Sequence, residues 1–377
     1  SRGPAAMQTL SRLPQAGTAG LGLGLAALPL AGGLLARLLG LVGDQSLVSF
    51  PAILWRYRNA DFEAFMRKHR ESFRRARETG DYVPGVCHYY SLMSSLITLA
   101  SGPFWHFVPM FRGLSRTACH EKFHQTLTQH LEAKSGDRIL ELGCGYGEMG
   151  RQVALISGAS VTGLTMADEE IAEGGRRIRE AGLEGRCQMV QGNYHKMSFE
   201  DASFDKIFGV YTLKYSADLD QVFREAARLL KPGGKFLSYE VLVTDKYDPS
   251  DRQQRFYVEQ ISSSTCMPPL WSARAFRAAA EKAGLKAGEE LDLCGPASGA
   301  EQWYSCFTRT GVHHLLSCPL LRPLVAAAEA LRLLPRSFTD FFDSCLVHPA
   351  TDFVNAGRLG IVSGAIVMSW VKPGAAA

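Results

Sequence analysis

The sequence predicts an α/β fold in which a parallel sheet carries helices on both faces. From Asp137 onward, short apolar runs alternate with amphipathic stretches of helical length, a rhythm typical of such sheets. A glycine-spaced turn follows the first apolar run, and a Pro-Gly-Gly sequence ends one helical stretch. The 377 residues are 46% hydrophobic and 21% charged, which allows a large buried core.

Seven segments have the length and apolar character of strands. They are residues 138–142, 160–164, 187–191, 204–210, 235–239, 285–293 and 360–371, the last with a bulge. The helical stretches are 149–157, 169–181, 219–230 and 276–283, followed by an apolar stretch, 319–334, that is interrupted at Pro323. Ligands of such sheets bind beyond the carboxyl ends of the strands, so residues at these ends should converge on one cleft.

The turn after the first strand is the most informative segment of the chain. Gly143, Gly145 and Gly147 alternate there, so the backbone can adopt positive φ and a ligand can lie against the main chain. The acidic Glu141 just before the turn suits an ammonium group or ribose hydroxyls better than a phosphate. The turn lacks the Lys and Ser/Thr of a phosphate-binding loop, and Glu148 replaces the third glycine of a dinucleotide fingerprint. The turn therefore suits a nucleoside with a cationic or neutral tail, a description that fits S-adenosylmethionine.

The first 43 residues contain no Asp or Glu and are rich in Gly, Ala and Leu. Residues 18–42 are long enough to cross a bilayer, which takes about 20 apolar residues, although Pro29 and Arg37 weaken this interpretation. A membrane anchor or signal-anchor, a cleaved transit peptide and a soluble tail all stay open. The basic helical run at residues 67–77 fits either contact with anionic lipid or a solvated helix face.

Bulk composition limits the partners that we expect. The net charge of +4 does not by itself indicate nucleic-acid binding, and we expect none. The nine cysteines are scattered without a CxxC pair, which favours reduced thiols in a cytosol-facing compartment. We expect the endoplasmic reticulum or another intracellular membrane, with the catalytic domain facing the cytosol; a transit peptide remains an alternative. We expect no metal site.

Several short motifs outside the glycine turn resemble those of a known family. They are Trp105-His-Phe107, His120-Glu121, Val161-Thr-Gly-Leu164, Tyr239-Glu240, Thr244-Asp-Lys-Tyr-Asp248, Trp303-Tyr304 and Gly357-Arg-Leu-Gly-Ile361. Together with the turn, they resemble class I S-adenosylmethionine-dependent methyltransferases, and more closely the sterol C-24 methyltransferases and related algal triterpene methyltransferases. The similarity runs from about residue 85 to about residue 373.

The resemblance implies a Rossmann-like, seven-stranded class I methyltransferase sheet with helices on both faces, and the whole chain divides into four expected regions. Residues 1–45 would be the apolar anchor or targeting segment, and residues 46–130 a helical lid and substrate region. Residues 131–294 would form the cofactor-binding core, and residues 295–377 a C-terminal region with lipid-pocket helices and the last strand.

The resemblance also implies roles for individual residues around S-adenosylmethionine. Glu141 would anchor the amino end of the cofactor, and the three glycines would cradle its methionine part. Asn193 would bond the adenine amine. The full set of expected cofactor-binding residues is Glu141, Gly143, Cys144, Gly145, Gly147, Thr165, Asn193, Tyr194 and Val210.

The implied reaction is attack of an electron-rich alkene on the sulfonium methyl, which leaves a carbocation on the substrate. Aromatic faces such as those of Tyr211 and Tyr215 would stabilise that cation, and Glu240 is the first candidate for the base that removes a proton, followed by His106 and His120. Alternatively, Glu240 is a structural carboxylate and the two tyrosines are pocket lining. The family has a Glu and a His where this chain has the two tyrosines, and residues 98–103 lack the family's aromatic and acidic motif.

Three functions from different classes remain open at this stage. The first is a methyltransferase acting on the side-chain alkene of a sterol or triterpenoid. The second is a methyltransferase acting on another lipid or a phenolic small molecule, and the third is a non-catalytic protein that retains the cofactor fold. For all three we expect a hydrophobic small-molecule ligand, membrane association and the possibility of a homo-oligomer.

Overall fold

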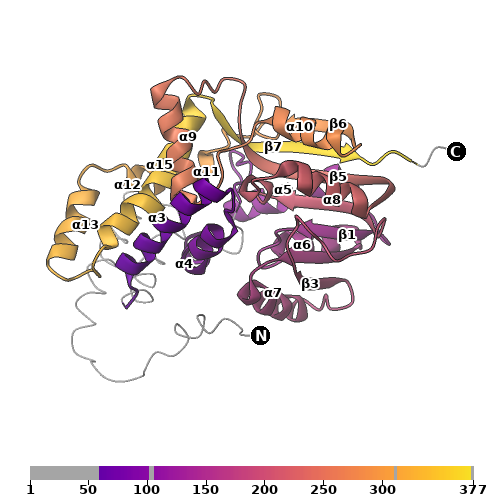
Figure 1. Ribbon diagram of the computed structural model, residues 1–377, viewed down its shortest axis with the longest axis horizontal. Coiled ribbons are helices and arrows are strands. Elements are labelled where there is room, and N and C mark those ends of the chain that lie inside the picture. The colour runs from indigo at the N-terminus through magenta and orange to yellow at the C-terminus, as the bar shows by residue number, and fades with distance from the viewer. Residues whose placement is uncertain (1–58, 102–105, 310–311, 375–377) are drawn as a thin grey trace.

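The computed structural model describes residues 59–101, 106–309 and 312–374. The expected anchor at residues 1–45 and Trp105 lie outside the described residues. Within them, a twisted sheet forms one half of the molecule and a lobe of helices forms the other (Figure 1).

The sheet has seven strands in the order β3-β2-β1-β4-β5-β7-β6. The strands are β1 Arg138–Leu142, β2 Ser160–Thr165, β3 Cys187–Gln191, β4 Phe204–Val210, β5 Leu230–Val243, β6 Lys286–Asp292 and β7 Val362–Val371. Each predicted strand is present, and β1 pairs in parallel register with β2 and β4. The seven strands and their central parallel pairings confirm the predicted Rossmann-like fold.

The prediction of a parallel sheet does not hold for the last strand. β7 lies between β5 and β6 and is antiparallel to both of them. Val362 at its start pairs with Val243 at the end of β5, and Val371 at its end pairs with Lys235. The chain reaches β7 from the helical lobe at the carboxyl edge of the sheet, so this strand can only run back toward the amino edge.

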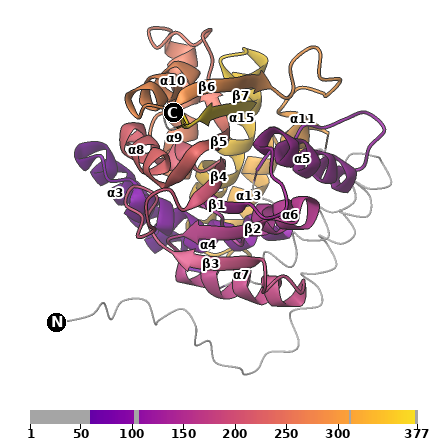
Figure 2. The same ribbon diagram turned by 90° about the vertical axis from the view of Figure 1, so that its right-hand side faces the viewer.

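Helices cover the two faces of the sheet, as Figure 2 shows in a view along the strands. One face carries α5 Arg116–Leu131, α6 Glu148–Ser157 and α7 Asp168–Glu180, and the other carries α8 Leu219–Leu229 and α10 Ala273–Lys282. The alternation of strand side chains produces two separate cores. Ile139 packs with α5 and α6, whereas its neighbour Leu140 packs with α8 and α10.

The helical lobe is assembled from the first two described helices, from the helix after β5 and from the helices between β6 and β7. Its members are α3 Phe62–Thr79, α4 Val83–Ser101, α9 Arg252–Thr265, α11 Ser305–Thr308, α12 Val312–Leu316, α13 Leu321–Ala330, α14 Phe338–Phe341, η2 Phe342–Val347 and α15 His348–Arg358. The ring of Phe62 in α3 meets Phe338 edge-on at 5.2 Å and Phe341 at 4.7 Å between centroids. The indigo and gold helices therefore lie side by side in Figure 1.

The predicted apolar stretch at residues 319–334 forms α13 without an interruption at Pro323. Pro323 lies in the first turn of the helix, where a backbone N–H has no intrahelical acceptor and proline is tolerated. Val325 is buried, but Leu320, Leu324 and Leu331 are 65–71% exposed. No helix among the described residues combines the length and the apolar character needed to cross a membrane.

Candidate active site

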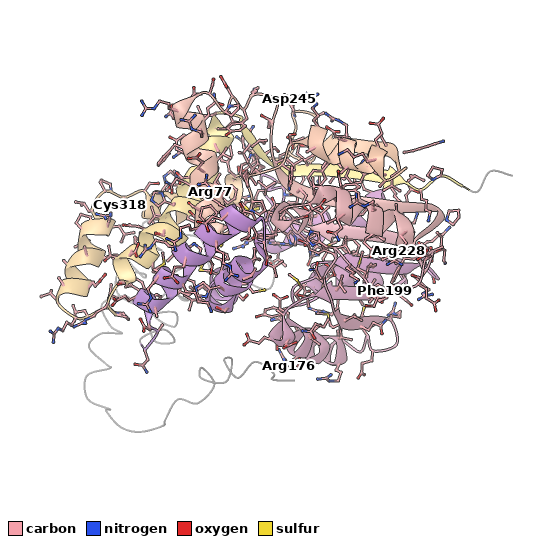
Figure 3. All side chains as sticks on the ribbon, in the orientation of Figure 1. Arg77, Arg176, Phe199, Arg228, Asp245 and Cys318 are labelled. Carbon is pink, nitrogen blue, oxygen red and sulfur yellow. The ribbon has the colours of Figure 1, made fainter. Side chains whose placement is uncertain are left out.

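The carboxyl ends of the parallel strands face the helical lobe, where the predicted residues converge. Phe199 and Arg228, which flank the amino end of β4, lie on the opposite side, away from the lobe that carries Cys318 (Figure 3). The ends of β1, β2, β3 and β4 bring Gly143–Gly147, Thr165, Asn193 and Val210 to one edge of the sheet. Adjacent parallel strands necessarily place these ends together.

The glycine turn adopts the conformation that the sequence predicts. Gly143, Gly145 and Gly147 have φ values of 60°, 53° and 68°, the left-handed region in which side chains are strained. A Cβ on Gly143 would lie 1.9 Å from Oγ1 of Thr212, so the turn packs directly against the segment after β4. The backbone N–H of Cys144 donates to the carbonyl of Leu164 at 3.0 Å and ties the turn to β2. The Cys144 side chain is buried, and burial raises the pKa of its thiol, so it lines the site as a neutral group.

Glu141 lies beneath this turn and is 3% exposed. Its Oε2 accepts a hydrogen bond of 2.9 Å from the backbone N–H of Gly150 in the first turn of α6. Burial raises the pKa of this carboxyl to about 8, and the Gly150 hydrogen bond and Arg151 oppose the rise. A neighbouring cation would favour the charged form of this group. Its expected role at the amino end of the cofactor stays a prediction.

The end of β2 carries a carboxylate that the sequence analysis missed. Thr165 is buried, and its hydroxyl donates to Oε2 of Glu170 in α7. Burial raises the pKa of Glu170. Glu170 thus brings an acid to the strand end at which Thr165 itself offers only a hydroxyl. The available signal was an acidic residue in the first turn of the next helix.

Asn193 and Tyr194 follow β3 directly. The Asn193 side-chain oxygen accepts a 2.9 Å hydrogen bond from the backbone N–H of His195, and Gly192 is held to Thr165 by a 2.9 Å backbone bond. Tyr194 is buried, with its hydroxyl 3.4 Å from the carbonyl of Thr212. Their predicted contacts with the adenine of the cofactor remain predictions, as does the role of the half-buried Val210 in the wall.

Tyr211, immediately after β4, has a φ of 54°. A non-glycine residue in this region costs about 1–3 kcal/mol and persists only where surrounding contacts hold it. Its hydroxyl donates to the carbonyl of Gly364 in β7, and its ring stacks on Tyr239 at 5.3 Å. Phe107 meets the Tyr211 ring edge-on at 5.4 Å. Tyr211 is therefore a rigid part of an aromatic wall.

The rest of this wall comes from distant segments. The Phe107 ring lies 5.7 Å from Trp303, 4.8 Å from Phe307 and 5.3 Å from Phe353 between centroids. The Tyr239 hydroxyl donates to the backbone carbonyl of Phe107 at 3.0 Å. The segment before α5 and the C-terminal region thus meet over the ends of β4 and β5.

Glu240 is completely buried in β5, next to a buried lysine. Its Oε1 accepts hydrogen bonds from the backbone N–H groups of Thr212 at 3.1 Å and Leu213 at 2.8 Å, whereas Oε2 has no hydrogen-bond partner among the described residues. Burial raises the pKa of Glu240 and lowers that of Lys214, and their mutual attraction opposes both shifts.

The Lys214 ammonium lies over the rings of Tyr211 and Tyr215, 4.5 Å and 5.1 Å from their centroids. Lys214 was not predicted, because nothing in the sequence pattern marks this lysine as buried.

The second expected tyrosine lies further toward the helical lobe. The hydroxyl of Tyr215 is 2.6 Å from that of Tyr90 in α4, and the two rings meet edge-on. This contact joins the end of β4 to the helices before the sheet. Tyr90 was not predicted, because the contact joins residues 125 positions apart.

His106 and His120 are brought together, and a third histidine joins them. The ring centroids of His106 and His120 are 6.0 Å apart, and His124 lies 6.5 Å from the first and 6.1 Å from the second. His106 also lies 6.3 Å from the Tyr211 ring. The sequence analysis overlooked His124, although its spacing of four residues from His120 on a helix was a usable signal.

These groups fit a sulfonium nucleoside. The glycine turn offers bare backbone at positive φ, and the buried Glu141 and Glu170 offer acids beside it. Aromatic faces lie beyond, over β4 and β5. Acidic and aromatic groups favour a cation and disfavour a polyphosphate.

Comparison with known proteins agrees with this geometry. A family model described as a methyltransferase domain matches residues 133–292. The sterol 4-C-methyltransferase strm-1 of Caenorhabditis elegans is 33% identical over 86% of this chain and 97% of its own length. The 24-methylenesterol C-methyltransferase 2 of Oryza sativa is 28% identical over 80% of this chain and 83% of its own length. A solved structure of geranyl diphosphate methyltransferase with S-adenosylmethionine shares the fold, with a TM-score of 0.52 and 18% identity over 71% of this chain and 97% of that one.

Proposed function

The chain belongs to the sterol C-methyltransferase family and is an S-adenosylmethionine-dependent methyltransferase, and from this premise we propose that it methylates a carbon atom of a sterol or a related triterpenoid. The observation that supports the substrate class is the aromatic wall, which consists of Tyr211, Tyr239, Phe107 and Trp303. It lies beside the sheet edge that carries Gly143–Gly147, Thr165 and Asn193, called the cofactor edge below. Aromatic faces in this packed cluster would suit an apolar ring system and a cationic intermediate.

The cofactor supplies an electrophilic methyl group on a cationic sulfur. Gly143–Gly147 would hold its methionine part against the backbone, with Glu141 beneath the turn. Glu170, through Thr165, would lie near the ribose, and Asn193 and Tyr194 near the adenine. Phe107 and the C-terminal residues packed on it would exclude water from the substrate side.

Glu240 is the candidate base at the reacting end of the site. Two backbone N–H groups hold Oε1 in place, which leaves Oε2 for a proton. A raised pKa suits a carboxylate that must take a proton near neutral pH. We propose methylation of a side-chain alkene as the first candidate reaction. Glu240 would then remove a proton after the methyl transfer.

A ring carbon is the second candidate position. The relative with 33% identity is named a sterol 4-C-methyltransferase, and this chain has Tyr211 and Tyr215 where the resemblance to side-chain enzymes implies a Glu and a His. Position 4 of a sterol adjoins the C-3 oxygen, so it becomes nucleophilic when C-3 is a ketone and a base removes the C-4 proton. Glu240 would then act before methyl transfer instead of after it.

One experiment tests the proposal and separates the two positions. Purified protein is incubated with methyl-labelled S-adenosylmethionine and a panel of Δ24-sterols, 3-ketosterols, squalene and phenolic lipids. Label in a side chain supports the first position, and label at C-4 supports the second. Label only in phenolic lipids, or cofactor binding without any transfer, would overturn the proposal. For 3-ketosterols, hydrogen–deuterium exchange at C-4 without methyl transfer would report the base step alone.

We also propose that the enzyme works at an intracellular membrane, from which it takes its substrate. The support is the exposed side of α13. Leu320, Leu324 and Leu331 are 68%, 65% and 71% exposed, and their spacing of four and seven residues places them on one helix face. The exposed Arg332 and Arg336 follow directly and would meet anionic headgroups. The helix lies at the far end of the lobe (Figure 1).

Vesicle co-sedimentation of the full chain tests this membrane surface. Replacing the three leucines by Ser should reduce binding to anionic vesicles by roughly tenfold or more, because each leucine loses apolar area buried in the lipid. Leu155→Ser on α6, where the leucine is 53% exposed, is the matched control. Equal binding by the triple variant and the control would reject α13 as the docking surface.

A further inference from the structure

Three histidines form a compact cluster at α5, one of the helices that cover the sheet. His120 and His124 are on α5, one turn apart and both buried, and His106 comes from the segment just before the helix. The donor nitrogens of the three rings all lie within 4.8 Å of one another. The ring of Phe123 packs 5.1 Å from His106 and helps to separate the cluster from solvent.

The chemistry of the cluster suits a transition metal. All three side chains are imidazoles, and a neutral imidazole binds a metal through the lone pair of one ring nitrogen. The i and i+4 positions place His120 and His124 on one face of the helix α5.

We propose that His106, His120 and His124 bind a divalent late first-row transition metal, with Zn²⁺ as the expected ion. Imidazole ligands suit Zn²⁺, Cu²⁺, Ni²⁺ and Fe²⁺, whereas Mg²⁺ and Ca²⁺ require oxygen ligands. In a tetrahedral zinc site with Zn–N distances of 2.0–2.1 Å, the nitrogens are about 3.3 Å apart. Binding would therefore draw the donor atoms together by up to about 1.5 Å, and His106 lies outside regular secondary structure, where the backbone can follow.

A metal here would fasten the segment before α5 to the helix itself. Phe107, the centre of the aromatic wall, is the next residue after His106, so the metal would fix the position of that wall. The charges that act on the cluster are Arg116 and Lys214, which oppose a dication, and Glu148, which favours it. The proposed metal would therefore position the aromatic wall. Three protein ligands leave one of its coordination positions open.

Metal content of the full chain tests this proposal. Tag-free protein is stripped with a chelator, dialysed against Zn²⁺ and analysed by elemental mass spectrometry. We expect one Zn²⁺ per chain, and a loss of at least tenfold in affinity for each of His106→Gln, His120→Gln and His124→Gln. His130→Gln is the matched control, because His130 lies on the same helix but pairs with Glu289 outside the cluster. Less than about 0.1 equivalent of Zn²⁺ in the wild type, or equal loss in the control, would overturn the site.

A second readout covers variants that fail to fold. Co²⁺ in the wild-type chain should give the intense visible absorption of a four-coordinate site, and Zn²⁺ should displace it. A weak six-coordinate spectrum would contradict the proposal. Binding of S-adenosylmethionine, measured in parallel by calorimetry, shows whether the methyltransferase site is intact, so failure of the metal site is distinguishable from failure of the proposed function.

Discussion

The cofactor edge of the sheet and the aromatic wall above it hold their side chains by different means. At the cofactor edge, Gly143, Thr165 and Asn193 lie together because the strands that carry them pair in parallel register. In the wall, Tyr211 is held by the carbonyl of Gly364, 153 positions away, and Tyr239 by that of Phe107, 132 positions away. Strand pairing thus positions the residues predicted to bind the cofactor, whereas contacts between distant segments position the aromatic wall proposed for the substrate, and changes in one region should leave the other intact.

The largest expected effect is a loss of turnover, without a loss of cofactor binding, when Glu240 is replaced. Glu240→Gln keeps an oxygen for the backbone N–H groups of Thr212 and Leu213 but removes the base, so kcat should fall about 10²- to 10⁴-fold. The dissociation constant of S-adenosylmethionine should change little. Radiolabelled methyl transfer and calorimetry measure the two quantities.

A double variant distinguishes a base from a counter-ion. Glu240→Gln combined with Lys214→Met removes both members of the buried pair. Recovery of turnover in the double variant would mean that Glu240 serves only to balance Lys214. Continued loss supports its role as the base.

The next largest effect should be a loss of cofactor affinity caused by a substitution in the glycine turn. Gly143→Ala places a Cβ 1.9 Å from Thr212 Oγ1 and forces Ala to a φ of 60°, so cofactor affinity should fall by roughly 100-fold, equivalent to about 2.7 kcal/mol. Gly136→Ala is the matched control, because Gly136 also has positive φ but has nothing within 4 Å of an added Cβ. If both variants bind S-adenosylmethionine equally, the close approach at Gly143 has no role in binding.

A substitution in the aromatic wall should weaken binding of the lipid substrate and leave cofactor binding nearly unchanged. Phe107→Ala removes a ring that contacts Tyr211, Trp303 and Phe353 and should destabilise the protein by about 3–5 kcal/mol. In the folded fraction, the KM for the lipid substrate should rise several-fold while cofactor affinity stays within about twofold. The exposed Phe256→Ala is the control for loss of an aromatic ring. A parallel loss of cofactor affinity would show that the two regions are coupled.

The pH dependence of unfolding tests Glu141 in the cofactor-free protein. Because its folded pKa is raised to about 8, the unfolded chain releases this proton at lower pH than the native protein does. Its contribution to the free energy of unfolding should therefore decline as pH rises from about 4.5 to about 8, by a few kcal/mol in total. Glu141→Gln should flatten this slope in chemical denaturation at fixed pH values. An unchanged slope would mean that Glu141 is ionised in the native protein.

The histidines should give a pH dependence of the opposite sign. The folded pKa values of His120 and His124 are lowered to about 3 and about 4, so only the unfolded chain takes up protons as pH falls below about 6.5. Stability should therefore fall between about pH 6.5 and pH 4 in the presence of a chelator. The double variant His120→Gln, His124→Gln should lose part of this dependence, and His130→Gln should retain it.

The sequence by itself determined the sheet and the cofactor edge. The periodicity of the apolar runs, the helix-stopping Lys231–Gly234 and the alternating glycines are local signals, because a strand, a helix end and a positive φ each depend on a few neighbouring residues. The antiparallel β7 was not among these signals, since its direction follows from where the chain re-enters the sheet.

Only the tertiary structure decided which neighbours the predicted catalytic candidates have. Glu240 and the buried Lys214 attract each other, Tyr215 meets Tyr90, and His106 joins His120 and His124. The protonation state of each group is set by burial and by partners brought in from other segments, and neither quantity exists until the helical lobe has packed against the sheet.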